Sequence, residues 1–179
     1  MRRLGMALML AVLGLARTGL AQEVTVDLLV GTDPDRFLSR MTDLIAGFGG
    51  PQGLTAAGIE EHIVLERAAA RASEVRRFLA MDLDADGTVN RAELAVSQRA
   101  ASASARGRLE RLFIAADADG DGQVSPAEIA AKGRDAGLRA LGEDEAEALR
   151  GLTALDRDGN RALTPDEVAA ALVLADPAT

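Results

Sequence analysis

Cysteine, tryptophan and tyrosine are absent from this sequence, and only four of its 179 residues are phenylalanine. Without cysteine the chain forms no disulfide, so its stability must come from packing and bound ligands. A core must therefore be built from Leu, Ala, Val and Ile. Because Ala, Leu, Arg and Glu are strong helix formers and the residues that fill sheets are scarce, the composition predicts an all-α fold.

Histidine is nearly absent as well, since His62 is the only one. A zinc hydrolase needs at least one further nitrogen or sulfur ligand, and a Ser-His-Asp triad would depend on this residue alone. No nucleophile elbow or phosphate-binding glycine loop accompanies it. We interpret His62 as a solvated residue of a helix, and we predict that the protein is not an enzyme.

Acidic residues outnumber basic ones by 28 to 20, which gives a net charge of −8. Such a charge repels nucleic acid and anionic membrane surfaces, so neither is an expected partner. It suits a protein that neutralises itself with cations, although most acidic proteins simply have a solvated surface. The positions of the carboxylates decide between these two interpretations.

The N-terminal residues 1–21 have the three parts of a secretory signal peptide. Arg2 and Arg3 are followed by an uncharged apolar run over residues 4–16 and then by small residues up to Ala21. The apolar run is shorter than the roughly 20 residues of a bilayer-spanning helix. We therefore interpret this segment as a cleaved export signal; an uncleaved membrane anchor is the alternative.

Cleavage is expected after Ala21, which predicts a periplasmic or secreted protein without a membrane span. It would remove three arginines and no acidic residue, leaving 17 basic against 28 acidic residues and a net charge of −11. Residues 22–32 then form an N-terminal tail, which is either a short strand or unpaired.

Three twelve-residue segments, at residues 82–93, 117–128 and 156–167, repeat one pattern. Each has acidic or amide side chains at its first, third and fifth positions, an oxygen-bearing side chain at the ninth and glutamate at the twelfth. Carboxylates this close repel one another by about 4 kcal/mol per pair at surface-like dielectric, and a divalent cation reverses the sign. Calcium takes about six to eight oxygen ligands, and a glutamate that binds through both oxygens completes its shell.

These segments resemble the calcium-binding loops of the EF-hand family, and the resemblance extends over most of the chain from about residue 70 onward. It implies a calcium ion held in each loop by side chains at positions one, three, five and twelve, by the carbonyl at position seven and by an oxygen at position nine. The implied ligands are Asp82, Asp84, Asp86, Thr88, Asn90 and Glu93; Asp117, Asp119, Asp121, Gln123, Ser125 and Glu128; and Asp156, Asp158, Asn160, Ala162, Thr164 and Glu167.

The third loop departs from the family pattern at its sixth position. The first two loops have Gly87 and Gly122 at this sharp turn, whereas the third has Arg161. A non-glycine residue with positive φ costs roughly 1 kcal/mol, and a cation beside the ion adds repulsion. We expect weaker calcium binding in this loop; the alternative is a loop that keeps its shape and holds no ion.

EF-hands work in pairs, so three loops predict a fourth. The three loops begin at residues 82, 117 and 156, so their starts are 35 (117 − 82) and 39 (156 − 117) residues apart. This is room for an exiting helix, a short link and an entering helix, and it argues against the more compact dockerin repeats.

A segment placed 35 residues before the first loop, residues 47–58, keeps Leu54 and Thr55 at positions eight and nine but has no acidic ligand. It is either a decayed hand, which would pair Leu54 with Val89, or a glycine-rich connection between helices.

The expected architecture is two lobes of helix–loop–helix pairs with short β contacts between paired loops. The first lobe is residues 33–105, with the decayed hand and the functional hand at 82–93. The second is residues 106–175, where loops 117–128 and 156–167 would pair. The Ala- and Ser-rich stretch 96–108 is expected to connect the lobes. The β contacts are expected at position eight of the loops, at Val89, Val124 and Leu163.

Helix-start signals recur along the chain, as a capping residue followed by proline at Asp33-Pro34, Ser125-Pro126 and Thr164-Pro165. Helices are expected over about residues 33–46, 55–80, 91–105, 107–116, 126–139, 143–155 and 165–175. Large apolar residues at three-to-four-residue spacing before the loops should face the core: Phe78, Met81, Leu109, Leu112, Phe113, Leu149, Leu152 and Leu155.

Calcium binding admits two kinds of function. One is a calcium buffer or a calcium-stabilised structural or interaction module. The alternative is a sensor, in which calcium exposes a groove for a protein partner. Sensor grooves use flexible methionine, yet only Met41 and Met81 lie beyond the signal segment. The composition therefore favours the first role.

Overall fold

The computed structural model describes residues 33–175 as two compact units. One unit contains residues 33–59 and 147–175, and the other contains residues 60–146. The predicted signal peptide, its cleavage point and the tail at residues 22–32 lie outside the described residues. None of the helices between residues 33 and 175 is both long and apolar enough to cross a membrane.

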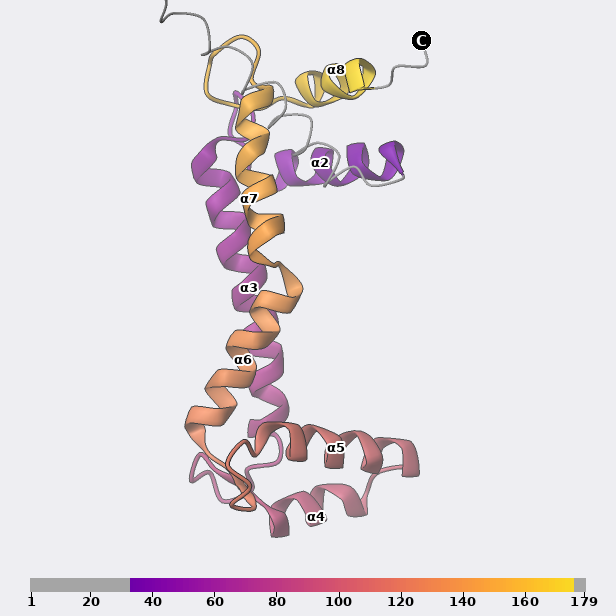
Figure 1. Cartoon of the computed structure of the whole chain (residues 1–179), viewed down its shortest axis with the longest axis vertical. Coiled ribbons are helices and arrows are strands. Elements are labelled where there is room, and N and C mark those ends of the chain that lie inside the picture. The colour runs from indigo at the N-terminus through magenta and orange to yellow at the C-terminus, as the bar shows by residue number, and fades with distance from the viewer. Residues whose placement is uncertain (1–32, 176–179) are drawn as a thin grey trace, which may run out of the picture. The chain divides into compact units, whose positions relative to one another are not determined.

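The fold is all-α, as the composition predicts (Figure 1). The helices are α2 (Pro34–Phe48), α3 (Ala56–Leu79), α4 (Arg91–Arg99), α5 (Ala103–Ala116), α6 (Pro126–Ala140), α7 (Glu143–Gly151), the 3-10 helix η1 (Leu152–Leu155) and α8 (Pro165–Ala175). The strands are β1 (Val89–Asn90) and β2 (Gln123–Val124). Helix positions agree with the prediction to within a few residues except between α4 and α5.

Residues 60–146 contain two helix–loop–helix hands in which α3 and α4 flank the first acidic loop and α5 and α6 flank the second. The loops pair through β1 and β2, which run antiparallel with Val89 opposite Val124 and Asn90 opposite Gln123. The buried core of this unit comes from all four helices and both loops: Phe78, Met81, Val89, Leu94, Phe113, Ala116, Val124 and Ile129. Leu109 and Leu112 pack against it partly buried, which confirms their predicted core-facing positions.

The stretch 96–108 is not a link between lobes, because it turns the chain back within this pair of hands. Helix α4 ends at Arg99 and α5 begins at Ala103, and the two helices pack together. Ser102 caps α5 by accepting the Ala105 amide at 3.4 Å. Arg106 donates to the carbonyl of Arg99 at the end of α4 (3.1 Å) and to that of Ala101 in the turn (3.0 Å), which satisfies groups that a longer helix would have used.

Helices α3 and α6 approach closely within the same unit because α6 carries two glycines one turn apart. A Cβ at Gly133 would lie 2.9 Å from Val75 Cγ2, and one at Gly137 would lie 3.1 Å from the Arg67 carbonyl oxygen. Arg67 adds two polar contacts just beyond the end of α6. Its Nε donates to the Leu141 carbonyl at 2.9 Å, and its Nη2 lies 3.2 Å from Glu143 Oε2.

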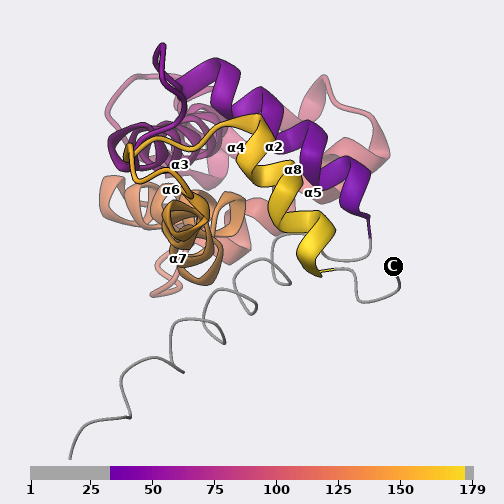
Figure 2. The same ribbon diagram turned by 90° about the horizontal axis from the view of Figure 1, so that it is seen from above.

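The other unit is a helix–loop–helix pair as well. Asp33 caps α2 by accepting the Arg36 amide at 2.9 Å, and Pro34 occupies the first turn, as predicted. Helix α2 packs against α8 (Figures 1 and 2). Their buried side chains include Phe37 and Met41 from α2 and Val168 from α8. The predicted core positions Leu149, Leu152 and Leu155 are buried too.

Loop pairing differs from the expectation. Leu54 bridges to Leu163, not to Val89, and the loop at 117–128 pairs with the loop at 82–93, not with the one at 156–167. The α4–α5 turn brings the acidic loops 82–93 and 117–128 side by side, so the backbone of Val89 is already paired. Segment 47–58 and the loop at 156–167 then pair with each other. Segment 47–58 thus takes the place of a hand rather than being only a connection between helices.

Candidate metal centres

Each acidic loop gathers three carboxylates. In every case the first, third and twelfth residues have ligand atoms that all lie within 4.8 Å of one another. The three groups are Asp82, Asp84 and Glu93; Asp117, Asp119 and Glu128; and Asp156, Asp158 and Glu167. Within the described residues, no such group includes His62. Three anionic oxygens at this spacing repel one another unless a cation lies among them.

The closing glutamates are held in place by backbone amides from both ends of their loops. Glu93 accepts the Leu83 amide at 2.8 Å and the Asn90 amide at 2.9 Å. Glu128 accepts the amides of Ala118 (2.6 Å) and Ser125 (2.8 Å) in the same way. The bonds from the Asn90 and Ser125 amides are also the reciprocal half of a capping box at the start of α4 and of α6. The local helix-start signal therefore also aims the twelfth-position carboxylate into the loop.

Amide donors also favour the ionised form of these carboxyls. The pKa of Glu128 is lowered from its ordinary value, first by the Ser125 amide and then by the Ala118 amide. The pKa of Glu167 is lowered in the same way by the amides of Thr164 and Arg157. A hydrogen bond to a carboxylate stabilises its charged form, so both groups are negatively charged at neutral pH.

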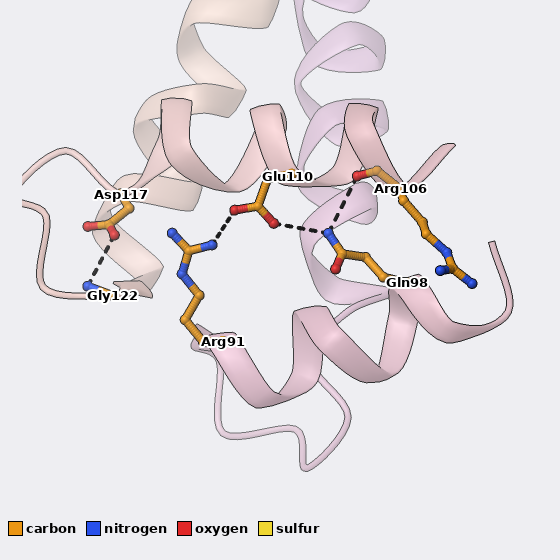
Figure 3. A network of polar contacts seen from close by, with 6 residues as sticks. All are labelled: Arg91, Gln98, Arg106, Glu110, Asp117 and Gly122. Atoms are coloured by element: carbon orange, nitrogen blue, oxygen red, sulfur yellow. Dashed lines mark hydrogen bonds and ion pairs between the residues drawn. The ribbon is translucent and has the colours of Figure 1, made fainter. Parts of the chain in front are cut away.

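In each of the first two loops, the first aspartate has one carboxylate oxygen that accepts a hydrogen bond and one that accepts none. Asp82 Oδ2 accepts the Gly87 amide at 3.0 Å, and Asp117 Oδ2 accepts the Gly122 amide at 3.1 Å (Figure 3). The Oδ1 atoms of both aspartates are buried without a hydrogen-bond partner. A buried anionic oxygen without a partner is costly, and a cation within the loop would satisfy it. The residues of these two loops therefore fit a divalent metal ion.

The fifth-position side chains lie in the same loops but outside the three-carboxylate groups. Asp86 Oδ1 accepts the Thr88 amide at 2.7 Å, and Asp121 Oδ1 accepts the Gln123 amide at 2.8 Å. Asn160 does the same for the Ala162 amide at 2.7 Å. These bonds hold the position-seven residues, whose carbonyls are implied as ligands. Coordination by positions five, seven and nine remains a prediction.

The ninth-position residues cap the exiting helices. Asn90 Oδ1 accepts the amides of Ala92 (2.9 Å) and Glu93 (3.2 Å). The hydroxyls of Ser125 and Thr164 each donate at 2.8 Å to the glutamate three residues later. Each of these side chains therefore touches its closing glutamate, through the backbone amide or through the carboxylate.

The third loop repeats this backbone despite Arg161. Its φ is 66°, in the left-handed region, and its amide donates to Asp156 Oδ2 at 2.7 Å as Gly87 and Gly122 do to theirs. Its ligand oxygens differ, however. Asp156 Oδ1 accepts the Gly159 amide at 2.9 Å, whereas the matching oxygens of the first two loops have no partner. An ion in this loop competes with that amide, which adds a second reason for weaker binding.

Position four of each loop also takes positive φ, a feature that the sequence analysis missed. The values are 61° at Ala85, 74° at Gly120 and 73° at Gly159. The glycines at this position in two of the three loops were the available signal, since glycine adopts this conformation without a steric penalty. Ala85 is therefore a strained residue in an otherwise regular first loop.

A polar network between α4 and α5 was missed too (Figure 3). The Arg91 guanidinium lies 4.3 Å from the centre of the Phe113 ring and pairs with Glu110, which also accepts Gln98 Nε2 at 3.0 Å. These bonds lower the pKa of Glu110, with the one from Arg91 contributing most. Arg91 and Glu110 are far apart in sequence and on separate helices, so no spacing rule could have linked them.

Comparison with known protein families supports the two hands of residues 60–146. A family model described as EF hand matches residues 75–96 and residues 109–131. These segments contain the loops at 82–93 and 117–128 with parts of their flanking helices. The third acidic loop and segment 47–58 lie outside the matched residues. Neither the curated proteins nor the solved structures contain a match to this chain.

Proposed function

Because this chain carries EF hands and so belongs to the EF-hand family, we propose that it binds calcium ions in the loops at 82–93 and 117–128 and, more weakly, at 156–167. The observation that carries the proposal is the buried, unpartnered Oδ1 of Asp82 and of Asp117, each within a cluster of three carboxylates. Oxygen-only ligands and a closing glutamate favour calcium over softer metals.

Calcium titration calorimetry on the purified protein tests this proposal. We expect two stronger sites and one weaker site. Glu93→Gln and Glu128→Gln should each remove one stronger site, and Glu167→Gln should remove the weaker one. Glu147→Gln, at an exposed position outside the loops, is the matched control and should leave all three. A protein that takes up no calcium at millimolar concentrations would overturn the proposal.

We further propose that calcium serves this protein as a buffered or stabilising ion. The support is compositional, because the chain has no cysteine with which to form a stabilising disulfide. Extracellular EF-hand modules bind calcium with Kd values of about 10⁻⁴–10⁻³ M, at which external calcium keeps them filled. At a hundredfold excess over Kd, each site adds about 2.7 kcal/mol to the free energy of unfolding.

A sensor function is the alternative, and it predicts that calcium exposes apolar surface. Flexible methionine favours such surfaces, yet Met41 and Met81 are both buried in the described residues. An apolar fluorescent dye distinguishes the two roles. A stabilising or buffering role predicts that dye fluorescence does not rise when calcium is added, and such a rise would favour the sensor.

Export to the periplasm or the exterior is part of the proposal, with the sequence of residues 1–21 as its support. Mass spectrometry of the protein purified from its native cells should find an N-terminus at Gln22. No catalytic role is proposed, since the sequence offers a single histidine and no cysteine for nucleophilic or metal-assisted chemistry.

A further inference from the structure

The loop between α2 and α3 has no acidic residue, yet it holds the third acidic loop by its backbone. The Leu54 amide donates to the Leu163 carbonyl at 2.9 Å, and the Leu163 amide donates to the Leu54 carbonyl at 2.8 Å. A tight turn presents Leu54, since the amides and carbonyls of Gly50 and Gly53 bond reciprocally at 2.9 and 3.0 Å. The amide and the carbonyl of Leu163 are thus both hydrogen-bonded to segment 47–58, which we call the ion-free loop.

Gly53 is the residue that permits this approach. Its φ is 118°, which side-chain-bearing residues rarely adopt, and a Cβ there would lie 2.5 Å from the Leu163 carbonyl oxygen. The obstructing atom belongs to the backbone of the partner loop, so no side chain can move aside. Gly50 differs, because a Cβ there meets nothing within 4 Å and its φ is not positive.

Gly58 lies where the three acidic loops have their closing glutamate. It follows Leu54 by four residues, as Glu93, Glu128 and Glu167 follow the paired residues of their own loops. A Cβ at Gly58 would lie 2.5 Å from the Phe48 carbonyl oxygen and 2.9 Å from Leu54 Cδ1. The position of the closing ligand is therefore filled by the end of α2. This loop partners a metal loop without competing for the ion.

We propose that the ion-free loop, with Gly53 as its positioning residue, sets the calcium affinity of the loop at 156–167. Leu163 lies between Ala162 and Thr164, the implied seventh- and ninth-position ligands, and the Thr164 amide holds Glu167 at 2.9 Å. Fixing the backbone of Leu163 therefore places three ligand positions before an ion arrives. This inference rests on the proposed calcium binding by the third loop.

A difference in cooperativity follows. In residues 60–146 each metal loop is paired with another metal loop, so an ion in one orders the backbone of the other through Val89 and Val124. The third loop is paired with a loop that binds nothing. We therefore expect its calcium binding to be independent of the filling of any partner loop, and we expect the first two sites to be coupled to each other.

The test compares Gly53→Ala with Gly50→Ala, each in a chain that also carries Glu93→Gln and Glu128→Gln so that only the third site is read. Calorimetry should find calcium binding about tenfold or more weaker in Gly53→Ala, because the strained backbone must move away from Leu163. Gly50→Ala should bind as the parent does. Equal affinities in the two variants, or a parent without a third site, would overturn the inference.

A second measurement applies if Gly53→Ala does not fold. In the unaltered protein, calcium should slow hydrogen exchange at the Leu54 amide, in a loop that holds no ion. Glu167→Gln should abolish this slowing without changing exchange at Val89 and Val124. Slowing that is absent, or that survives in Glu167→Gln, contradicts the inference. Calcium uptake confined to the loops at 82–93 and 117–128 would contradict this inference alone, whereas no uptake at all would contradict the proposed function as well.

Discussion

The two loop pairs share a backbone arrangement and differ in the charge that they enclose. Loops 82–93 and 117–128 together contain eight acidic residues at implied ligand positions, whereas the pair of 47–58 with 156–167 contains three, namely Asp156, Asp158 and Glu167. The β contact at position eight forms in both pairs. Loop pairing therefore depends on the apolar residue and its backbone, and the acidic positions determine only whether an ion is needed.

Calcium removal should separate the two pairs most clearly. With two sites at a hundredfold excess over Kd, residues 60–146 lose roughly 5 kcal/mol on chelation, and the other pair, with one site, loses roughly 3 kcal/mol at most. Thermal unfolding should therefore shift downward by many degrees. Hydrogen exchange should accelerate more at Val124 than at Leu163. An unchanged melting temperature in chelator would contradict this comparison.

Arg161→Gly should raise the calcium affinity of the third loop and so reduce the difference in affinity between the two loop pairs. Glycine accepts the left-handed backbone of this position, and the substitution removes a cation from the loop. We expect calcium affinity to rise by about tenfold, which corresponds to roughly 1.4 kcal/mol. Arg157→Gly is the matched control, because it removes the same charge at a residue without positive φ. A similar gain in both variants would assign the effect to charge alone.

Ala85→Gly should increase the free energy of unfolding by a smaller amount, through the first acidic loop. The substitution relieves an alanine at φ 61°, but glycine also gains freedom in the unfolded chain. The expected net gain in the free energy of unfolding is about 0.5 kcal/mol. Chemical denaturation would measure it, with Ala92→Gly, in the first turn of α4, as a control that should destabilise. A loss of stability in Ala85→Gly would show that the strain costs less than the freedom that glycine gains in the unfolded chain.

The Arg91–Glu110 pair should contribute least, because both side chains are substantially exposed and solvent screens the interaction. A double-mutant cycle with Arg91→Gln and Glu110→Gln should give a coupling of a few tenths of a kcal/mol at neutral pH. The pKa of Glu110 is lowered in the folded state, so the coupling is full above the ordinary value of 4.5 and is lost as pH falls through the lowered value. A coupling unchanged at acid pH would argue against the ion pair.

Much of the local structure was predictable because its signals are local. Ser125-Pro126 and Thr164-Pro165 begin helices where predicted, and the three acidic clusters gather the first, third and twelfth residues of their loops. Phe78 and Phe113 face the core, as their place before the loops predicts. Each of these features depends on a few adjacent residues.

The pairing of loops could not be predicted in the same way, since Leu54, Val89, Val124 and Leu163 are equally suitable partners by sequence. The structure assigns the partners through the turn at residues 100–102, whose capping by Ser102 and Arg106 shortens α4. The Ala- and Ser-rich composition of that stretch indicated a connection between two lobes, either a continuous helix or a flexible link, and gave no sign of the turn. The Gly53 approach to Leu163 depends on the same tertiary pairing and was equally inaccessible.

The glycines of α6 have a consequence for how its contact with α3 can move. Ile129, Gly133, Gly137 and Leu141 follow one another at four-residue intervals, so a bulky residue lies one turn before and one turn after the two glycines that contact α3. Sliding α6 by one helical turn, about 5.4 Å, would bring isoleucine or leucine against Arg71 or Arg67. The two helices are therefore held in one register, and within residues 60–146 this contact fixes the helices that enter the loop at 82–93 and leave the loop at 117–128.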